Sequence, residues 1–170
     1  MTNPLPERTL LEFIRYNNWA NRQVLQACRE LSEEQLAIGI PGAYGTIRET
    51  LGHILRAESW YVELLTGTRP QPAFDWQDGP DMEKMIEFHE QVATALEATA
   101  KGVDPGKVVR EEDEGQEYFY QALAVYIQII NHGVEHRTNI TTILNQGLSK
   151  PPDVDGWGYL TANTDRFEPK

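Results

Sequence analysis

Two histidines stand four residues apart near the end of the chain, in the segment His132-Gly-Val-Glu-His136. On a helix, residues four apart share one face with Cβ atoms about 5 to 6 Å apart, so both imidazoles can reach one metal ion. The same letters match the H-x-x-E-H string of inverted zinc peptidases, in which the glutamate acts on the bound water. The pair therefore indicates a peptidase site, a plainer metal site in a helix bundle, or two packed and hydrogen-bonded histidines.

A third histidine strengthens the metal interpretation. Zinc at catalytic sites usually takes three protein ligands and keeps one position open, and His53 lies on the inner face of a predicted helix among apolar residues. Three unrelated core imidazoles would each need a hydrogen-bond partner to offset burial. We therefore predict a metal site formed by His53, His132 and His136. His89 also falls on an inward line, but it has no histidine four residues away and has Met neighbours, which favours a packing role.

Two other metal sites fit the letters less well. A ferritin-like di-iron bundle needs Glu-x-x-His twice, yet Ile129 and Gly133 stand three residues before the two histidines. An inverted peptidase would use Glu135 as general base and a distant carboxylate as third ligand. It would also need a cleft for a peptide substrate, and a small helix bundle offers little room for one. Glu135 lies about 100° around the helix from His136, so we expect it at the surface or supporting a ligand.

Helix signals recur along the chain, and strand signals are scarce. Thr9 with Glu12 and Thr46 with Glu49 form capping boxes, Asp81 is a further cap, and Gly147 is a C-terminal stop. Apolar residues recur with helical periodicity after each start. The predicted helices are 9–31, 46–66, 81–102 and 121–146, with a short turn at 32–35 and a short helix at 157–160. We expect an all-α four-helix bundle in a single domain, residues 1–170.

The connections carry one exception to the helical pattern. Residues 67–80 are rich in Pro, Gly and Asp and read as a loop. Residues 107–120 place two β-prone ends around an acidic turn with Gly115, which predicts a small β-hairpin before the last long helix.

Composition limits the classes of function. The formal net charge of −11 and the lack of a Lys/Arg cluster argue against a nucleic-acid partner. No segment approaches the roughly 20 apolar residues of a membrane span, so we expect a soluble protein. The single Cys28 allows no internal disulfide and no signal-peptide-like run is present, which favours the cytoplasm. With 170 residues the chain can bury a core without a metal, so an ion would serve function more than folding.

Three segments resemble a known family: "YNNWAN" at 16–21, "TIRETLGHILRAESWY" at 46–61 and "IINHGVEHR" at 129–137. Together they are similar to the DinB-like superfamily of damage-inducible, metal-binding four-helix-bundle proteins. In that family a histidine of the second helix and an H-x-x-x-H pair of the last long helix bind one divalent metal. The resemblance places these ligands at His53, His132 and His136. Thr138 and Asn139 stand where many relatives have Gly-Gln.

The resemblance also implies a function. Members include thiol-dependent S-transferases and a thiol-dependent isomerase, so we expect a metal-dependent thiol S-transferase with one zinc or nickel ion and a low-molecular-weight thiol. The alternatives are a metal-dependent hydrolase and a non-catalytic metal-binding protein of the stress response. The expected partners are small molecules, and a homodimer is implied as well. No catalytic residue is assigned, since Cys28 falls on a core line and makes a poor nucleophile.

Two further pairs of residues have open roles. Asn17 and Asn21 are polar residues on an inner line, where they either orient a ligand or form buried hydrogen bonds between helices. Trp60 and Tyr61 lie next to the predicted site, and we expect them in the core rather than stacked on a substrate.

Overall fold

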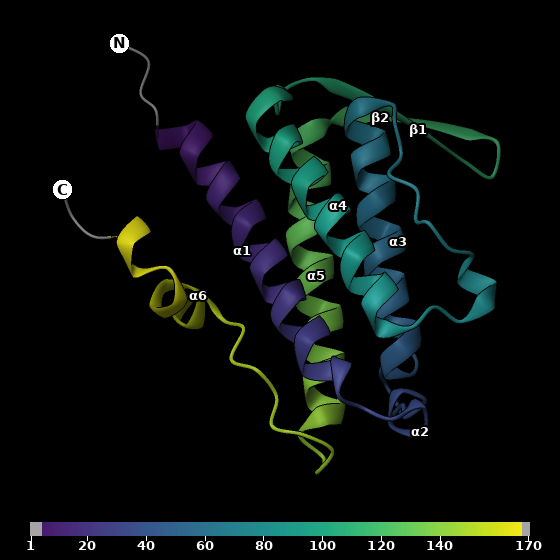
Figure 1. Ribbon diagram of the computed structural model, residues 1–170. Coiled ribbons are helices and arrows are strands. Elements are labelled where there is room, and N and C mark those ends of the chain that lie inside the picture. The colour runs from purple at the N-terminus through teal and green to yellow at the C-terminus, as the bar shows by residue number, and fades with distance from the viewer. Residues whose placement is uncertain (1–4, 168–170) are drawn as a thin grey trace.

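Four long helices lie side by side in the computed structural model, which describes residues 5–167 (Figure 1). They are α1 (Leu5–Arg29), α3 (Ile47–Thr66), α4 (Met82–Gly102) and α5 (Ala122–Leu144). Helix α1 packs against α4 and α5, and α3 packs against the same two helices, so α1 and α3 are diagonal partners. The prediction of an all-α four-helix bundle is confirmed.

Short elements fill the connections. They are α2 (Glu33–Leu36), the 3₁₀ turn η1 (Trp76–Asp78), the strands β1 (Val108–Asp113) and β2 (Gln116–Gln121), α6 (Gly156–Ala162) and the 3₁₀ turn η2 (Thr164–Arg166). The two strands form the predicted antiparallel hairpin, with Val108 opposite Gln121 and Asp113 opposite Gln116. Glu114 and Gly115 join them with positive φ angles of 48° and 78°, as a tight hairpin turn requires.

The start of α3 shows the local chemistry that positions His53. The Thr46 hydroxyl accepts the backbone N–H of Glu49 at 3.2 Å, and the Glu49 carboxylate accepts the backbone N–H of Thr46 at 2.8 Å. This capping box is the predicted one. The helix ends at Gly67, whose φ of 80° is left-handed, a conformation that glycine adopts without steric strain.

The predicted start of the first helix is wrong. Helix α1 begins at Leu5, so Thr9 lies inside the helix rather than at its N-cap. Proline is tolerated in a first helical turn because its missing N–H would have no partner there, and Pro6 occupies that turn. Nothing in the sequence between Leu5 and Thr9 stops a helix, so the helix starts one turn earlier than predicted.

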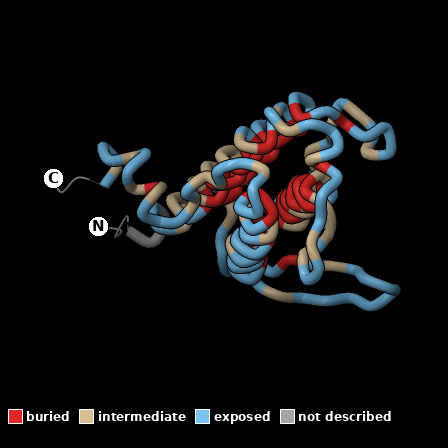
Figure 2. The backbone as a smooth tube through the Cα atoms, turned by 90° about the horizontal axis from the view of Figure 1, so that it is seen from below, coloured by how far each residue is buried: buried red, intermediate tan, exposed pale blue. Residues whose placement is uncertain are grey.

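Buried positions line the inside of the bundle, whereas the hairpin and the loops are mostly exposed (Figure 2). Large apolar side chains from all four long helices fill this space, among them Ile14, Leu51, Leu96 and Ile140. Within residues 5–167, no helix is long and apolar enough to cross a membrane.

Candidate metal centre

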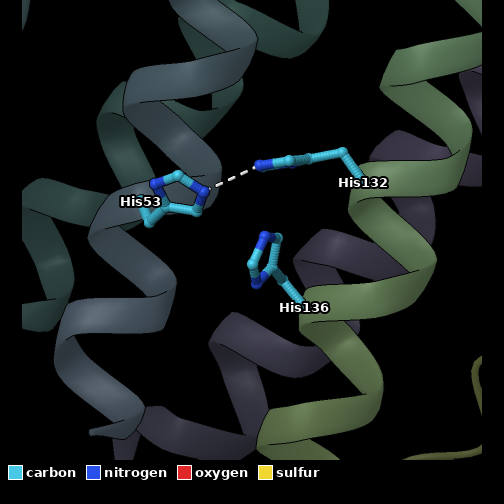
Figure 3. A group of neighbouring side chains, drawn as sticks. All are labelled: His53, His132 and His136. Carbon is cyan, nitrogen blue, oxygen red and sulfur yellow. Dashed lines mark hydrogen bonds between the residues drawn. The ribbon is translucent and has the colours of Figure 1, made fainter. Parts of the chain in front are cut away.

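Three histidines from two neighbouring helices come together inside the bundle. His53 projects from α3, and His132 and His136 project from successive turns of α5, with the three rings pointing toward one another (Figure 3). One ring nitrogen of each lies within 4.8 Å of the others, and the Nε2 atoms of His53 and His132 are 2.9 Å apart. The structure thus brings the three sequence-predicted residues into one group that could hold a metal ion.

The spacing of the nitrogens suits a small ion. Tetrahedral zinc with Zn–N bonds of about 2.0 to 2.1 Å separates two ligand nitrogens by roughly 3.3 Å. The 2.9 Å contact is slightly shorter than this value, and the 4.8 Å limit on the whole group is longer. The two values therefore bracket the nitrogen spacing that a single tetrahedral ion requires.

The three imidazoles are held in the neutral form. Burial lowers the pKa of His132 to about 3, with smaller contributions from the neighbouring His136 and His53. Burial is also the main cause that lowers the pKa of His53 and of His136. A metal ligand must be a neutral imidazole with a free lone pair. At neutral pH the group therefore offers three uncharged nitrogen donors without first losing a proton.

Two ring nitrogens of the group lack hydrogen-bond partners. The Nδ1 atoms of His132 and His136 are buried and have no hydrogen-bond partner within the described part of the chain. Metal-binding histidines usually donate the other ring N–H to an oxygen acceptor. Here the rings instead contact aromatic neighbours, Tyr44 beside His136 and Tyr61 beside His132.

Tyr44 covers one side of the site. Its ring stacks on His53 with centroids 4.1 Å apart and meets the edge of His136 at 5.1 Å. It belongs to the segment between α2 and α3, and its side chain is half-exposed. Sequence analysis missed this residue; its signal is an aromatic side chain two residues before the N-cap of the helix that carries His53.

A buried polar network lies next to the two α5 histidines. Arg137, next to His136, donates from Nη1 to the side-chain oxygens of Asn17 at 2.8 Å and Asn21 at 2.7 Å. Both asparagines donate in turn to Oε1 of Glu58, at 2.6 and 2.7 Å. Of the two roles considered for these asparagines, the structure supports buried hydrogen bonds between helices. The network joins α1, α3 and α5 at the depth of the histidines.

The carboxyl group in this network is unusual in its environment. Glu58 is completely buried, which raises its pKa, although hydrogen bonds from both asparagines and the charge of Arg137 act in the opposite direction. Its Oε2 and Nη2 of Arg137 have no partner among the described residues. The two groups are thus connected through amides, and no ion pair is formed between them in the described structure.

His89 and Glu135 lie outside the group. His89 is buried on α4, where its Nε2 is 3.2 Å from the backbone oxygen of Asn18, and burial lowers its pKa to about 4. The Glu135 side chain is exposed. A peptidase site built on Glu135 and a further carboxylate therefore finds no support in the described residues, and His89 has the surroundings of a packed core histidine.

Cys28 cannot serve as a nucleophile in this fold. Its side chain is fully buried in the core of α1, and burial raises the pKa of its thiol to about 12. The thiolate is the reactive form of cysteine, so this thiol stays protonated and inaccessible near neutral pH.

Trp60 and Tyr61 belong to the site region more than expected. Both line a cavity of about 390 Å³ that also borders His53 and His132. Tyr61 is otherwise buried in the core, with its ring 5.8 Å from that of His132, whereas Trp60 is only half-buried. The prediction that both residues belong to the core therefore holds for Tyr61, which also borders the cavity. It holds only in part for Trp60, whose side chain is half-buried.

Comparison with known proteins agrees with this architecture. The profile of the DinB family matches residues 1–169. The chain is also similar to Protein DinB of Bacillus subtilis (strain 168), with 23% identity over 159 residues, which cover 86% of this chain and 91% of the relative. The chain therefore belongs to the DinB family.

Proposed function

We propose that the protein binds one divalent metal ion through His53, His132 and His136 and acts as a metal-dependent thiol S-transferase. The observation that carries the proposal is the convergence of three neutral imidazoles from two helices, two of them buried and that of His53 partly buried, beside a cavity. The reaction joins the sulfur of a small thiol to an electrophilic carbon of a second small molecule, while the thiol proton passes to solvent and the leaving group departs.

Zinc and nickel are the ions that this donor set favours. Imidazole nitrogens suit borderline metals such as zinc and nickel, whereas magnesium and calcium prefer oxygen ligands. No carboxylate belongs to the group within the described residues. When bound by three neutral ligands, such an ion lowers the pKa of a thiol that reaches its open position and so supplies a thiolate nucleophile.

The protein's own residues hold and shield the reacting groups. The histidines keep their ring nitrogens directed toward one point, and Tyr44 covers the His53 and His136 rings on one side. The cavity that borders His53 and His132 leaves access from another side. Because the thiol of Cys28 is buried and protonated, the transferred thiol must be a separate small molecule.

Metal analysis tests the first half of the proposal. Protein purified without a His-tag and reloaded with zinc or nickel should contain about one ion per chain. His53→Ala, His132→Ala and His136→Ala should each remove tight binding. His89→Ala is the control, because this histidine is fully buried but lies outside the group, and it should retain the ion. Loss of the ion in His89→Ala alone would show that the ligand set is wrong.

Thiol titration tests the second half. Cobalt-substituted protein should develop a sulfur-to-metal charge-transfer band when a low-molecular-weight thiol is added. The band should persist in Cys28→Ser, which excludes the internal thiol, and should vanish in His132→Ala. If no thiol changes the spectrum while a model ester is hydrolysed in an ion-dependent manner, the protein is a hydrolase. If neither occurs, a non-catalytic role in metal binding or stress is the better description.

A further inference from the structure

The cavity beside the histidines has an unusual distribution of charge. Residues that line it include two metal-site histidines, two aromatic residues and two arginines: His53, His132, Trp60, Tyr61, Arg56 and Arg69. No carboxylate lines this cavity among the residues that the structure describes. The surrounding protein is strongly acidic, with 26 acidic and 15 basic residues. The cavity beside the histidines is thus lined by two arginines and by no acidic residue of the described chain, although both arginines also border an adjoining pocket that contains Asp75 and Asp78.

Arg56 is the less neutralised of the two arginines. Its guanidinium carbon lies 4.9 Å above the ring of Trp76, a cation–π arrangement. No ion pair joins it to any carboxylate among residues 8–167, whose side chains are described. Arg56 thus holds a positive charge three residues along α3 from His53, on a neighbouring helical position.

Arg69 is positioned mainly by neutral acceptors. It donates from Nε to the hydroxyl of Ser59 and from Nη2 to the backbone oxygen of Arg56, both at 3.2 Å. Its one carboxylate neighbour in the described structure is Glu63, at 3.8 Å near the limit of an ion pair and partly exposed to solvent. Other arginines of the bundle, such as Arg22 with Glu90, make short two-pronged contacts with a carboxylate.

We propose that this cavity binds the carboxylate of a small anionic substrate or thiol, with Arg56 and Arg69 as the binding residues. The inference rests on the proposed function for the reacting end of the ligand, which the same cavity directs toward His53 and His132. A volume of about 390 Å³ suits a small molecule. Arginine recognises carboxylates because its planar donors match the two oxygens, and Trp60 and Tyr61 provide an apolar wall for the carbon chain.

A matched pair of thiols isolates the contribution of the carboxylate. Isothermal titration of zinc-loaded protein should give a lower Kd for 3-mercaptopropionate than for its neutral amide. Arg56→Gln should raise the Kd of the carboxylate about tenfold, the loss expected for one charge-assisted hydrogen bond, and leave the Kd of the amide unchanged. Arg56→Lys should restore part of the preference. Arg22→Gln removes the same charge from a surface ion pair and should behave as wild type.

The design separates failure of this inference from failure of the proposed function. Equal Kd values for the acid and the amide in wild type, or a preference that Arg56→Gln leaves intact, would overturn the carboxylate site while thiol binding to the metal stands. Propionate has no thiol group. If propionate binds wild type but not Arg56→Gln, and no thiol binds to the metal, the anion site stands and the transferase proposal is overturned. Should Arg56→Gln lose its helical circular dichroism, Arg69→Gln carries the same comparison.

Discussion

Gly133 occupies the one position between the two α5 histidines where a side chain would meet the buried network. A Cβ atom built there would lie under 3.0 Å from Asn17 Oδ1 and from Arg137 Nη1. Gly133→Ala should therefore lower the free energy of unfolding by about 1 to 3 kcal/mol, although alanine is the better helix former by about 1 kcal/mol. Urea denaturation would measure the change.

Gly102→Ala is the control for helix propensity. Gly102 is also helical, and an added Cβ would find nothing within 4 Å. We expect this variant to be neutral or slightly more stable than wild type. If Gly133→Ala is equally stable, then Asn17 and Arg137 can move apart without loss, and the network does not constrain the spacing of His132 and His136.

His89 should make the apo protein sensitive to acid. Its pKa is lowered from 6.5 to about 4, chiefly by burial, with the charges of Glu90 and Arg22 acting in opposite directions. Between these values the unfolded chain binds a proton that the native protein excludes, so the free energy of unfolding falls as pH falls. At about 1.4 kcal/mol per pH unit the loss from this group is at most roughly 3 kcal/mol.

Comparison of metal-free wild type with His89→Gln isolates this contribution. Glutamine keeps an N–H donor for the Asn18 backbone oxygen but does not titrate in this range. Chemical denaturation at pH 6.5, 5 and 4 should show a shallower decline for the variant. Parallel declines would mean that the imidazole is protonated without leaving its native position.

At the level of single residues, the sequence identifies the three candidate histidines better than the residues around them. His132 and His136 are visible because helical spacing alone places them on one face. The roles of Tyr44 and Arg56 depend on contacts between segments that are separated in the sequence, such as Tyr44 with His136 and Arg56 with Trp76, which no local pattern encodes. The sequence shows Gly133 only as a glycine that weakens a helix. The structure explains why a glycine stands there, because Asn17 of another helix lies where a Cβ atom would be.

At the level of helices, the start of α3 is the end that matters most for the site. Thr46 caps it about two turns before His53, and the same segment carries Tyr44. Thr46→Ala should lower the free energy of unfolding by about 1 kcal/mol because an N-terminal amide loses its acceptor. Thr94→Ala is an exposed mid-helix change on α4 and should leave the free energy of unfolding nearly unchanged. Thermal melts of both variants would measure the two effects. Equal effects of the two changes would mean that the capping box adds nothing to α3.

Capping patterns predict helix ends only where the chain before them is not helical. Thr46 and Asp81 follow turn or loop segments, and both cap as predicted. The Thr9 pattern has the same letters, yet it follows residues that can themselves be helical, so α1 extends through it. Local sequence therefore predicted the type of each long element, while the boundary of α1 depended on residues before the capping pattern that continue the helix.

For the whole molecule, alternation of apolar and polar residues at helical spacing was enough to predict the bundle. Which helices are neighbours was not predictable from that pattern, because every long helix has an apolar face. The pairing of α3 with α5 is what brings His53 to the other two histidines. The cytoplasmic location, the single domain and the homodimer stay predictions, and light scattering at several concentrations would test the last.

The bundle should stay folded without its ion. Apolar side chains from all four long helices form the core independently of the histidines, so the metal acts only by preferring the native state. With free ion at 100 times its Kd, the binding linkage adds about 2.7 kcal/mol to the free energy of unfolding. Chelated protein should therefore keep its helical circular dichroism and unfold at lower urea than the zinc-loaded form, whereas His132→Ala should show no such difference. Collapse to coil on chelation would instead make the site structural, because the ion would then be required to hold α3 and α5 together.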